Sequence, residues 1–183
     1  MAWTREELAS FADRTIPDLM PDDLHLLFVG INPGLVSAAT GLHFARRGNR
    51  FYPALVKAGL VDTIDPAAAP AQLRERGVGI TNIVARASAR AEELDPAELV
   101  AGRERLEQLV IERRPRVVAI AGITSYRIAF GRRKAVLGPQ PDRLGASELW
   151  VVPNPSGLNA HENVESLAAA YRAAAVAADL LDD

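Results

Sequence analysis

An asparagine in a tight turn is the first residue whose type and position suit chemistry. Asn32 stands at the middle of GINPG (30–34), where glycine and proline bend the chain sharply. The preceding segment, 24–29, is an apolar run typical of a strand buried on both faces. Open α/β sheets bind ligands beyond the carboxyl ends of such strands. The pattern therefore predicts an amide at a ligand crevice, and an ordinary turn is the alternative.

Two other polar turns are predicted at the same edge of the sheet. A second buried strand, 77–84, has a turn near Asn82, and NPSGL (154–158) follows a strand over 149–153. Right-handed crossovers bring the carboxyl ends of parallel strands to one rim, so the three turns should lie together. The loop 35–49 adds further groups that could stack on a flat base or read its edge, namely Ser37, His43 and Phe44.

The charge distribution around these turns favours an anionic ligand. The net charge is −2, but no Asp or Glu occurs over 24–61 or over 113–141. Arginines accumulate in both segments, and those nearest the first turn are Arg46, Arg47 and Arg50. A protein that is acidic overall can present one face that accepts phosphate. Solvated surface arginines are the alternative for each of them.

Several function classes find no support in the sequence. With no cysteine and only three histidines, we expect no metal site and no thiol chemistry. No phosphate-binding P-loop, dinucleotide fingerprint or serine nucleophile elbow occurs, and we expect no cofactor. No apolar run approaches the ~20 residues that cross a bilayer, and the N-terminus lacks a secretory core. We expect a cytoplasmic protein with no membrane partner.

The positioning elements predict one domain over 1–183, with an N-terminal helix and lead-in over 1–20. Thr4 and Asp95 are predicted to cap helices, the second of them over 96–114. The alternation of strands and helices predicts a three-layer αβα sandwich with a mostly parallel sheet of about four strands. The strands are expected at 24–29, 77–84, 116–122 and 149–153, further helices at 51–58, 122–130 and 163–180, and a surface loop or hairpin at 131–147.

GINPG, the G-x-x-F-A…G-N-R-F loop and NPSGL together resemble the mismatch-specific uracil/thymine DNA glycosylases of the uracil-DNA glycosylase superfamily. The resemblance extends from about Leu24 to the final helix. It implies that Asn32 positions the attacking water and that Phe44 stacks on a base flipped out of the duplex. Further base contacts are implied for Ile31, Gly34, His43 and Asn82.

The same resemblance assigns residues to the DNA strands. Leu158 would wedge into the gap left by the flipped base, with Gly157 facing the orphan base; a merely packed leucine is the alternative. Ser37 would bind a phosphate or crowd a thymine methyl group. Phosphate or strand contacts are further implied for Arg46, Arg47, Arg50, Asn154 and Ser156.

The sequence thus leads to two hypotheses. The first is a monofunctional glycosylase, acting as a monomer on double-stranded DNA, that excises uracil opposite guanine. Thymine, ethenocytosine or deaminated purines are possible additional substrates. The second is a non-catalytic nucleotide or nucleic-acid binding module on the same scaffold. Release of the base from a G·U duplex separates the two.

Overall fold

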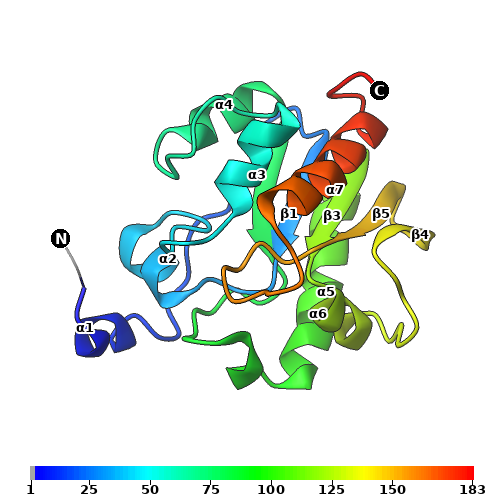
Figure 1. The fold of residues 1–183 in the computed structure, drawn as a ribbon. Helices are drawn as coiled ribbons and strands as arrows, with labels where there is room; N and C mark the ends of the chain where they lie inside the picture. Colours follow the sequence, from blue (N-terminus) through cyan, green and yellow to red (C-terminus); the bar gives the residue numbers. More distant parts are fainter. Residues whose placement is uncertain (1–2) are drawn as a thin grey trace.

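A five-stranded sheet forms the centre of the molecule, in the order β2-β1-β3-β5-β4 (Figure 1). The structure is a computed structural model that describes residues 3–183, so the first two residues of the predicted 1–20 lead-in lie outside the described residues. Neighbouring strands are parallel except for the β4–β5 pair. The strands are β1 (Leu26–Gly30), β2 (Val78–Asn82), β3 (Val117–Ala121), β4 (Gly138–Leu144) and β5 (Ser147–Val152).

Helices cover both faces of this sheet, which confirms the predicted αβα sandwich (Figure 1). Leu26 and Phe28 of β1 point into one core with α3 and α7, whereas Leu27 and Val29 point into a second core with α5 and α6. This alternation is the two-residue period of a strand buried on both faces. The helices are α1 (Arg5–Ala9), α2 (Leu35–Thr40), α3 (Phe51–Ala58), α4 (Ala69–Glu75), α5 (Pro96–Arg113), α6 (Ile123–Ala129) and α7 (Val164–Ala177).

The predicted strand count is corrected from about four to five, because β4 and β5 form an antiparallel hairpin within and beyond 131–147. The sequence did not predict β4 as a strand because it contains Pro139 and Pro141, and proline cannot donate a backbone hydrogen bond to a neighbouring strand. Both are accommodated because β4 lies at the edge of the sheet, and the pairing with β5 is irregular between Pro139 and Arg143.

Local capping signals place two of the helices as predicted. Thr4 and Glu7 form a reciprocal capping box at α1, and Asp95 and Glu98 form another at α5. The helices α2 and α4 were not predicted. In α4, Pro70 lies in the first turn, where a missing N–H costs nothing, so it starts the helix rather than breaking it.

The strands that carry the three polar turns end at one edge of the sheet. The neighbours β1, β2, β3 and β5 all run in the same direction, and their arrowheads point to the bottom of Figure 1. Helix α5 packs against the turn after β2, where the Arg105 guanidinium donates to the Ile83 carbonyl at 2.6 Å. Among residues 3–183, no helix has the length and apolarity needed to cross a membrane.

Candidate active site

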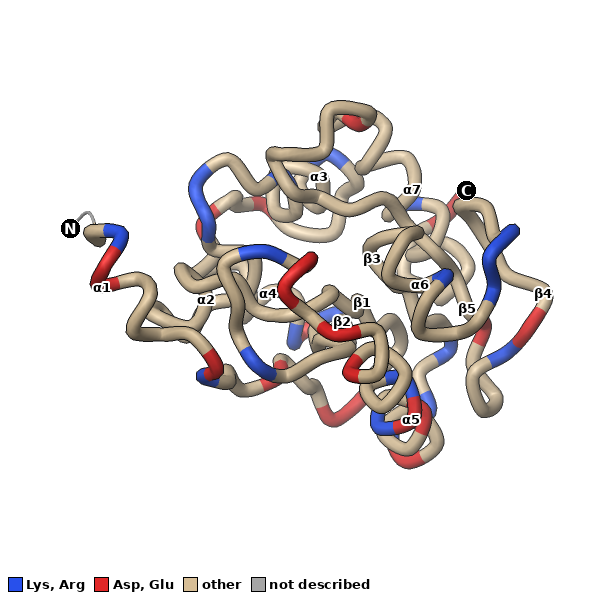
Figure 2. The backbone as a smooth tube through the Cα atoms, turned by 90° about the horizontal axis from the view of Figure 1, so that it is seen from below, with Lys and Arg blue, Asp and Glu red and all other residues tan. Residues whose placement is uncertain are grey.

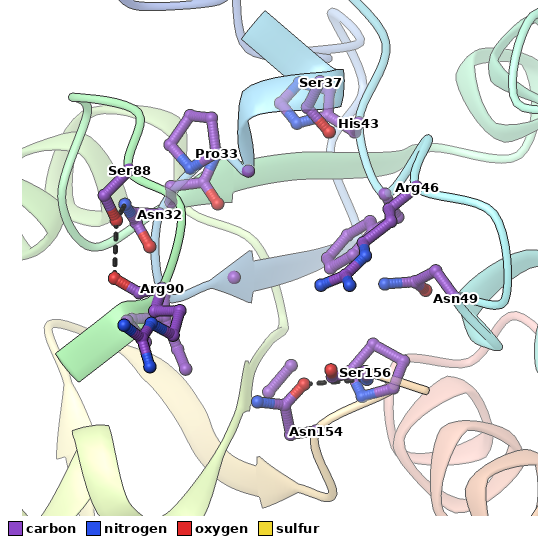
Figure 3. Close-up of a pocket in the computed structure, with 18 of the residues that line it drawn as sticks. Asn32, Pro33, Ser37, His43, Arg46, Asn49, Ser88, Arg90, Asn154 and Ser156 are labelled. Atoms are coloured by element: carbon purple, nitrogen blue, oxygen red, sulfur yellow. Dashed lines mark hydrogen bonds between the residues drawn. The ribbon is translucent and has the colours of Figure 1, made fainter. Parts of the chain in front are cut away.

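A cavity of about 170 Å³ lies at this edge, between the turns that follow β1, β2 and β5 (Figure 3). Asn32, Asn82 and Asn154 all line it, which confirms that the three turns meet. Its volume is below the range of about 300–1,000 Å³ that drug-sized ligands occupy. The cavity therefore suits one small group.

The amide of Asn32 is held in one orientation by two acceptors. Its Nδ2 donates to the Arg86 carbonyl at 3.0 Å and to the Ser88 hydroxyl oxygen at 2.8 Å. Ser88 in turn donates to the Arg90 carbonyl at 2.8 Å, so its oxygen must act as an acceptor toward Asn32 (Figure 3). Both amide hydrogens are thereby used. The amide oxygen has no hydrogen-bond donor in the described chain and is not buried, so it is free to accept one from a ligand or water.

The segment 85–90 that supplies these acceptors is anchored through Arg86. Its guanidinium forms a two-point pair with the Glu98 carboxylate, at 2.6 and 2.9 Å, and contacts Asp13 at 3.1 Å. The hydrogen bonds from Arg86 hold the pKa of the Glu98 carboxyl well below its ordinary value of 4.5. Sequence reasoning missed Arg86 and Ser88, since ARASAR (85–90) carries only the general signal of a polar loop after a strand.

Gly30 lies directly against the asparagine at the end of β2. A Cβ atom at Gly30 would lie 2.5 Å from Asn82 Oδ1, so any other residue would require the Asn82 amide to move from its present position. Gly34 differs, because a Cβ there would meet no atom within 4 Å. Gly34 lines the cavity as well, and its missing side chain leaves open space for a ligand.

Two polar side chains from the loop 35–49 are buried in the cavity wall. His43 is 9% exposed, and its Nε2 lies 2.9 Å from the Pro17 carbonyl, which can only accept. Burial lowers the pKa of the imidazole, so neutral His43 keeps the proton on Nε2 and an acceptor lone pair on Nδ1. Ser37 is 5% exposed and accepts from the Ala45 amide at 3.4 Å. Its position suits contact with a base better than contact with an external phosphate.

Phe44 presents an aromatic ring to the same cavity. The ring stacks on Phe51, with centroids 4.0 Å apart and planes inclined by 24°. Phe44 has a left-handed backbone with φ of 53°, which is uncommon for a bulky residue. The Tyr52 hydroxyl supports this conformation by donating to the His43 carbonyl at 3.0 Å. Ile31 completes the predicted base-binding set and also lines the cavity.

Basic side chains border the mouth without making it uniformly positive. Arg46 and Arg90 line the cavity from different segments and lie on opposite sides of it in Figure 3. Arg47 is exposed. A groove of about 610 Å³ continues outward from the cavity, and Glu92 and Glu162 line it together with Arg46 and Arg90. Figure 2, which views the molecule from this end, accordingly shows basic and acidic segments side by side.

The NPSGL turn projects from the groove as an exposed apolar tip. Leu158 is 73% exposed, so the alternative of a packed leucine is wrong. The adjoining Gly157 is also exposed, and Asn154 accepts from the Ser156 amide at 2.9 Å within the turn.

Arg50 requires a correction. Its guanidinium does not face outward to a phosphate but donates to the carbonyls of Ser156, Asn159 and Glu162 in the segment that carries Leu158. The predicted phosphate contact is therefore replaced by a role inside the fold. Asn49, its neighbour, was not predicted, and it lines the cavity while its Oδ1 accepts from the Phe51 amide.

Metal ligation has no geometric basis in the part of the chain that the structure describes. Within residues 3–183, no three His, Asp or Glu side chains are grouped so that they could hold a metal ion. The polar side chains that line the cavity are amides, hydroxyls, one imidazole and the guanidinium groups of Arg46 and Arg90.

Residues 17–176 match the family model described as the uracil DNA glycosylase superfamily. The chain belongs to this superfamily. The match includes all three turns of the cavity and every predicted site residue, and it supports DNA glycosylase activity and a DNA substrate in general terms. It does not distinguish among the branches of the superfamily.

A solved structure supports the fold independently. The chain is similar to the solution NMR structure of a proposed uracil DNA glycosylase from Methanosarcina acetivorans, with a TM-score of 0.60 and 16% sequence identity. The similarity covers 92% of this chain and 98% of the other. At this identity the comparison establishes the shared αβα architecture alone.

Proposed function

We propose that this protein is a monofunctional, mismatch-specific DNA glycosylase. It flips uracil out of a G·U pair and hydrolyses the N-glycosidic bond. One observation carries the proposal: both hydrogens of the Asn32 amide are occupied by Arg86 and Ser88, and its oxygen is left free at the cavity. An oxygen held in this way can accept a hydrogen bond from a water and orient its lone pair toward a sugar carbon.

In the proposed reaction, water adds to C1′ of the deoxyribose while the bond from C1′ to the base nitrogen breaks. The electron pair of that bond leaves with the base as an anion, the water loses a proton to solvent as the new C–O bond forms, and the base anion takes up a proton from solvent, so the products are the neutral base and the abasic sugar. A neutral amide is a poor base, so the C–N bond must be largely broken before water attacks. Stabilisation of the resulting oxocarbenium-like charge then depends on positioning and electrostatics.

The other cavity residues supply recognition. The flipped base lies against the exposed face of Phe44, whose opposite face rests on Phe51. Asn82 reads the base edge, since the described residues leave its side-chain amide without an internal partner. Neutral His43 offers an acceptor to a base N–H or to water, and Ser37 limits the space beside the base. Leu158 fills the gap in the duplex, and Arg46 and Arg47 contact phosphates.

The deciding assay uses a duplex with a single G·U pair, followed by alkaline cleavage at abasic sites. The wild-type protein should convert the duplex in a time-dependent reaction, whereas Asn32→Ala should lose about 10³-fold in rate and keep its affinity for DNA. Full activity of Asn32→Ala would refute the mechanism. Parallel duplexes with thymine, ethenocytosine or hypoxanthine define the range of excised bases.

The non-catalytic alternative predicts a different result in the same assay. A binding module would retain G·U duplexes without producing alkali-labile sites, even at high protein excess. The match of residues 17–176 to the uracil DNA glycosylase superfamily favours the enzyme over the binding module.

A further inference from the structure

One arginine joins the loop that forms the base cavity to the loop that carries the exposed leucine. Arg50 immediately precedes α3, and its Nη2 donates to the Ser156 carbonyl at 2.5 Å and to the Asn159 carbonyl at 2.8 Å. Its Nη1 donates to the Glu162 carbonyl. The backbone amide of Arg50 also donates to the Pro155 carbonyl at 3.0 Å. A single residue thus makes four contacts with the segment 155–162.

The positions of these carbonyls matter more than their number. Ser156 and Asn159 flank the tip formed by Gly157 and Leu158, so the guanidinium closes the base of that turn. The tip also rests directly on the neighbouring loop, since a Cβ atom at Gly157 would lie 2.6 Å from the Gly48 carbonyl oxygen. The segment 153–163 contains no helix or strand that could hold this shape by itself.

We propose that Arg50 is a positioning residue that holds Leu158 in the geometry needed to enter the duplex. This inference rests on the proposed function. Without the guanidinium, three carbonyls would lose their donor, and the turn would be held only by its internal hydrogen bonds, such as that from the Asn159 amide to the Ser156 carbonyl at 2.9 Å. The tip would then be less rigid than in the wild type. Insertion would then require ordering of the turn at the moment of base flipping, which slows the reaction. Arginine suits this task because its planar fork carries five donors, whereas lysine offers three from a single point.

The test is a double-mutant cycle in single-turnover kinetics on the G·U duplex. Arg50→Met should lower the rate by about 30-fold, the equivalent of one lost charge-assisted hydrogen bond. Leu158→Ala should lower it by a similar factor. If Arg50 acts through Leu158, the double variant should be within about 2-fold of Leu158→Ala alone. Arg50→Lys should recover part of the rate.

Two comparisons separate this effect from general damage. Arg76→Met removes an exposed arginine at the opposite end of the sheet, after α4, and should match the wild type. A duplex in which uracil lies in an unpaired bubble should reduce the penalty of Arg50→Met, because less extrusion is needed. If Arg50→Met fails to fold, Gly157→Ala serves instead, since it displaces the same tip and leaves Arg50 in place. Rate losses that multiply in the double variant would overturn the inference.

Hydrogen exchange tests the same contact without any reaction. In Arg50→Met, the backbone amides of 156–162 should exchange at least about 10-fold faster, while those of β1 and β3 keep their protection. Unchanged exchange over 156–162 would refute the positioning role even in an inactive protein. Failure of the proposed function would give a different result, because the wild-type protein would then release no base from the G·U duplex or from the bubble duplex.

Discussion

Removal of the Ser88 hydroxyl should slow the chemical step without changing the affinity for substrate. Ser88→Ala removes one of the two acceptors of the Asn32 amide and leaves the Arg86 carbonyl as the other. The backbone at this position is held separately, since the Ser88 amide donates to the Pro33 carbonyl at 3.2 Å. The variant therefore loses two side-chain hydrogen bonds, the one that Ser88 accepts from Asn32 and the one that it donates to the Arg90 carbonyl, and only the first of them acts on the Asn32 amide. One such bond contributes about 1 kcal/mol, which corresponds to a rate loss of about 5-fold.

Single-turnover measurements on the G·U duplex, with DNA affinity measured in parallel, test this prediction. The loss should appear in the rate constant and not in the dissociation constant, because the Asn32 oxygen acts on water and not on the bound base. Ser88→Thr keeps the hydroxyl and is the matched control, expected within about 2-fold of wild type. Equal rates for Ser88→Ala and wild type would show that the Asn32 amide needs no second acceptor. Equal losses in the alanine and threonine variants would assign the effect to shape instead.

Three further predictions concern other groups of the site. Burial lowers the folded-state pKa of His43 below its ordinary 6.5, so the unfolded chain binds a proton that the folded chain does not. The free energy of unfolding should therefore fall as the pH drops below about 6.5. In His43→Gln the urea midpoint should fall less than in the wild type between about pH 7.5 and pH 5.5. Equal falls of the urea midpoint in the two proteins would contradict this. Arg90 should contact a phosphate across the mouth from Arg46, so Arg90→Gln should reduce the slope of log affinity against log salt by about 0.9, and an unchanged slope would exclude the contact. Phe44→Leu should cost about 10-fold or more in base binding because it removes the stacking surface, while the thermal midpoint changes little; retained affinity would show that Phe44 is only a packing residue.

The family resemblance and the local patterns predicted most of the scaffold, but not α2, α4 or the edge strand β4. The apolar run before GINPG predicted a strand buried on both faces, and each residue of β1 is buried. Asp95 and Thr4 marked helix starts because their capping partners lie three residues away. Strand direction then brought Asn32, Asn82 and Asn154 to one cavity, as predicted. The edge strand β4 was not predicted because it contains prolines. Proline is tolerated at the edge of a sheet, but no local sequence pattern shows that a segment will lie at an edge.

The sequence by itself determined which residue types lie at the ends of the strands. This is possible because hydrophobic periodicity, helix capping and turn formation each depend on a few neighbouring residues. The tertiary structure alone decided how those side chains are used. Asn32 is oriented by Ser88, 56 positions away in the chain, and Arg50 binds the Glu162 carbonyl 112 positions away. From the sequence, Arg50 was predicted to contact a phosphate. In the folded chain it instead donates to carbonyls of the turn that carries Leu158. Hydrogen bonds between distant segments depend on how the chain packs, and no local pattern in the sequence encodes that packing.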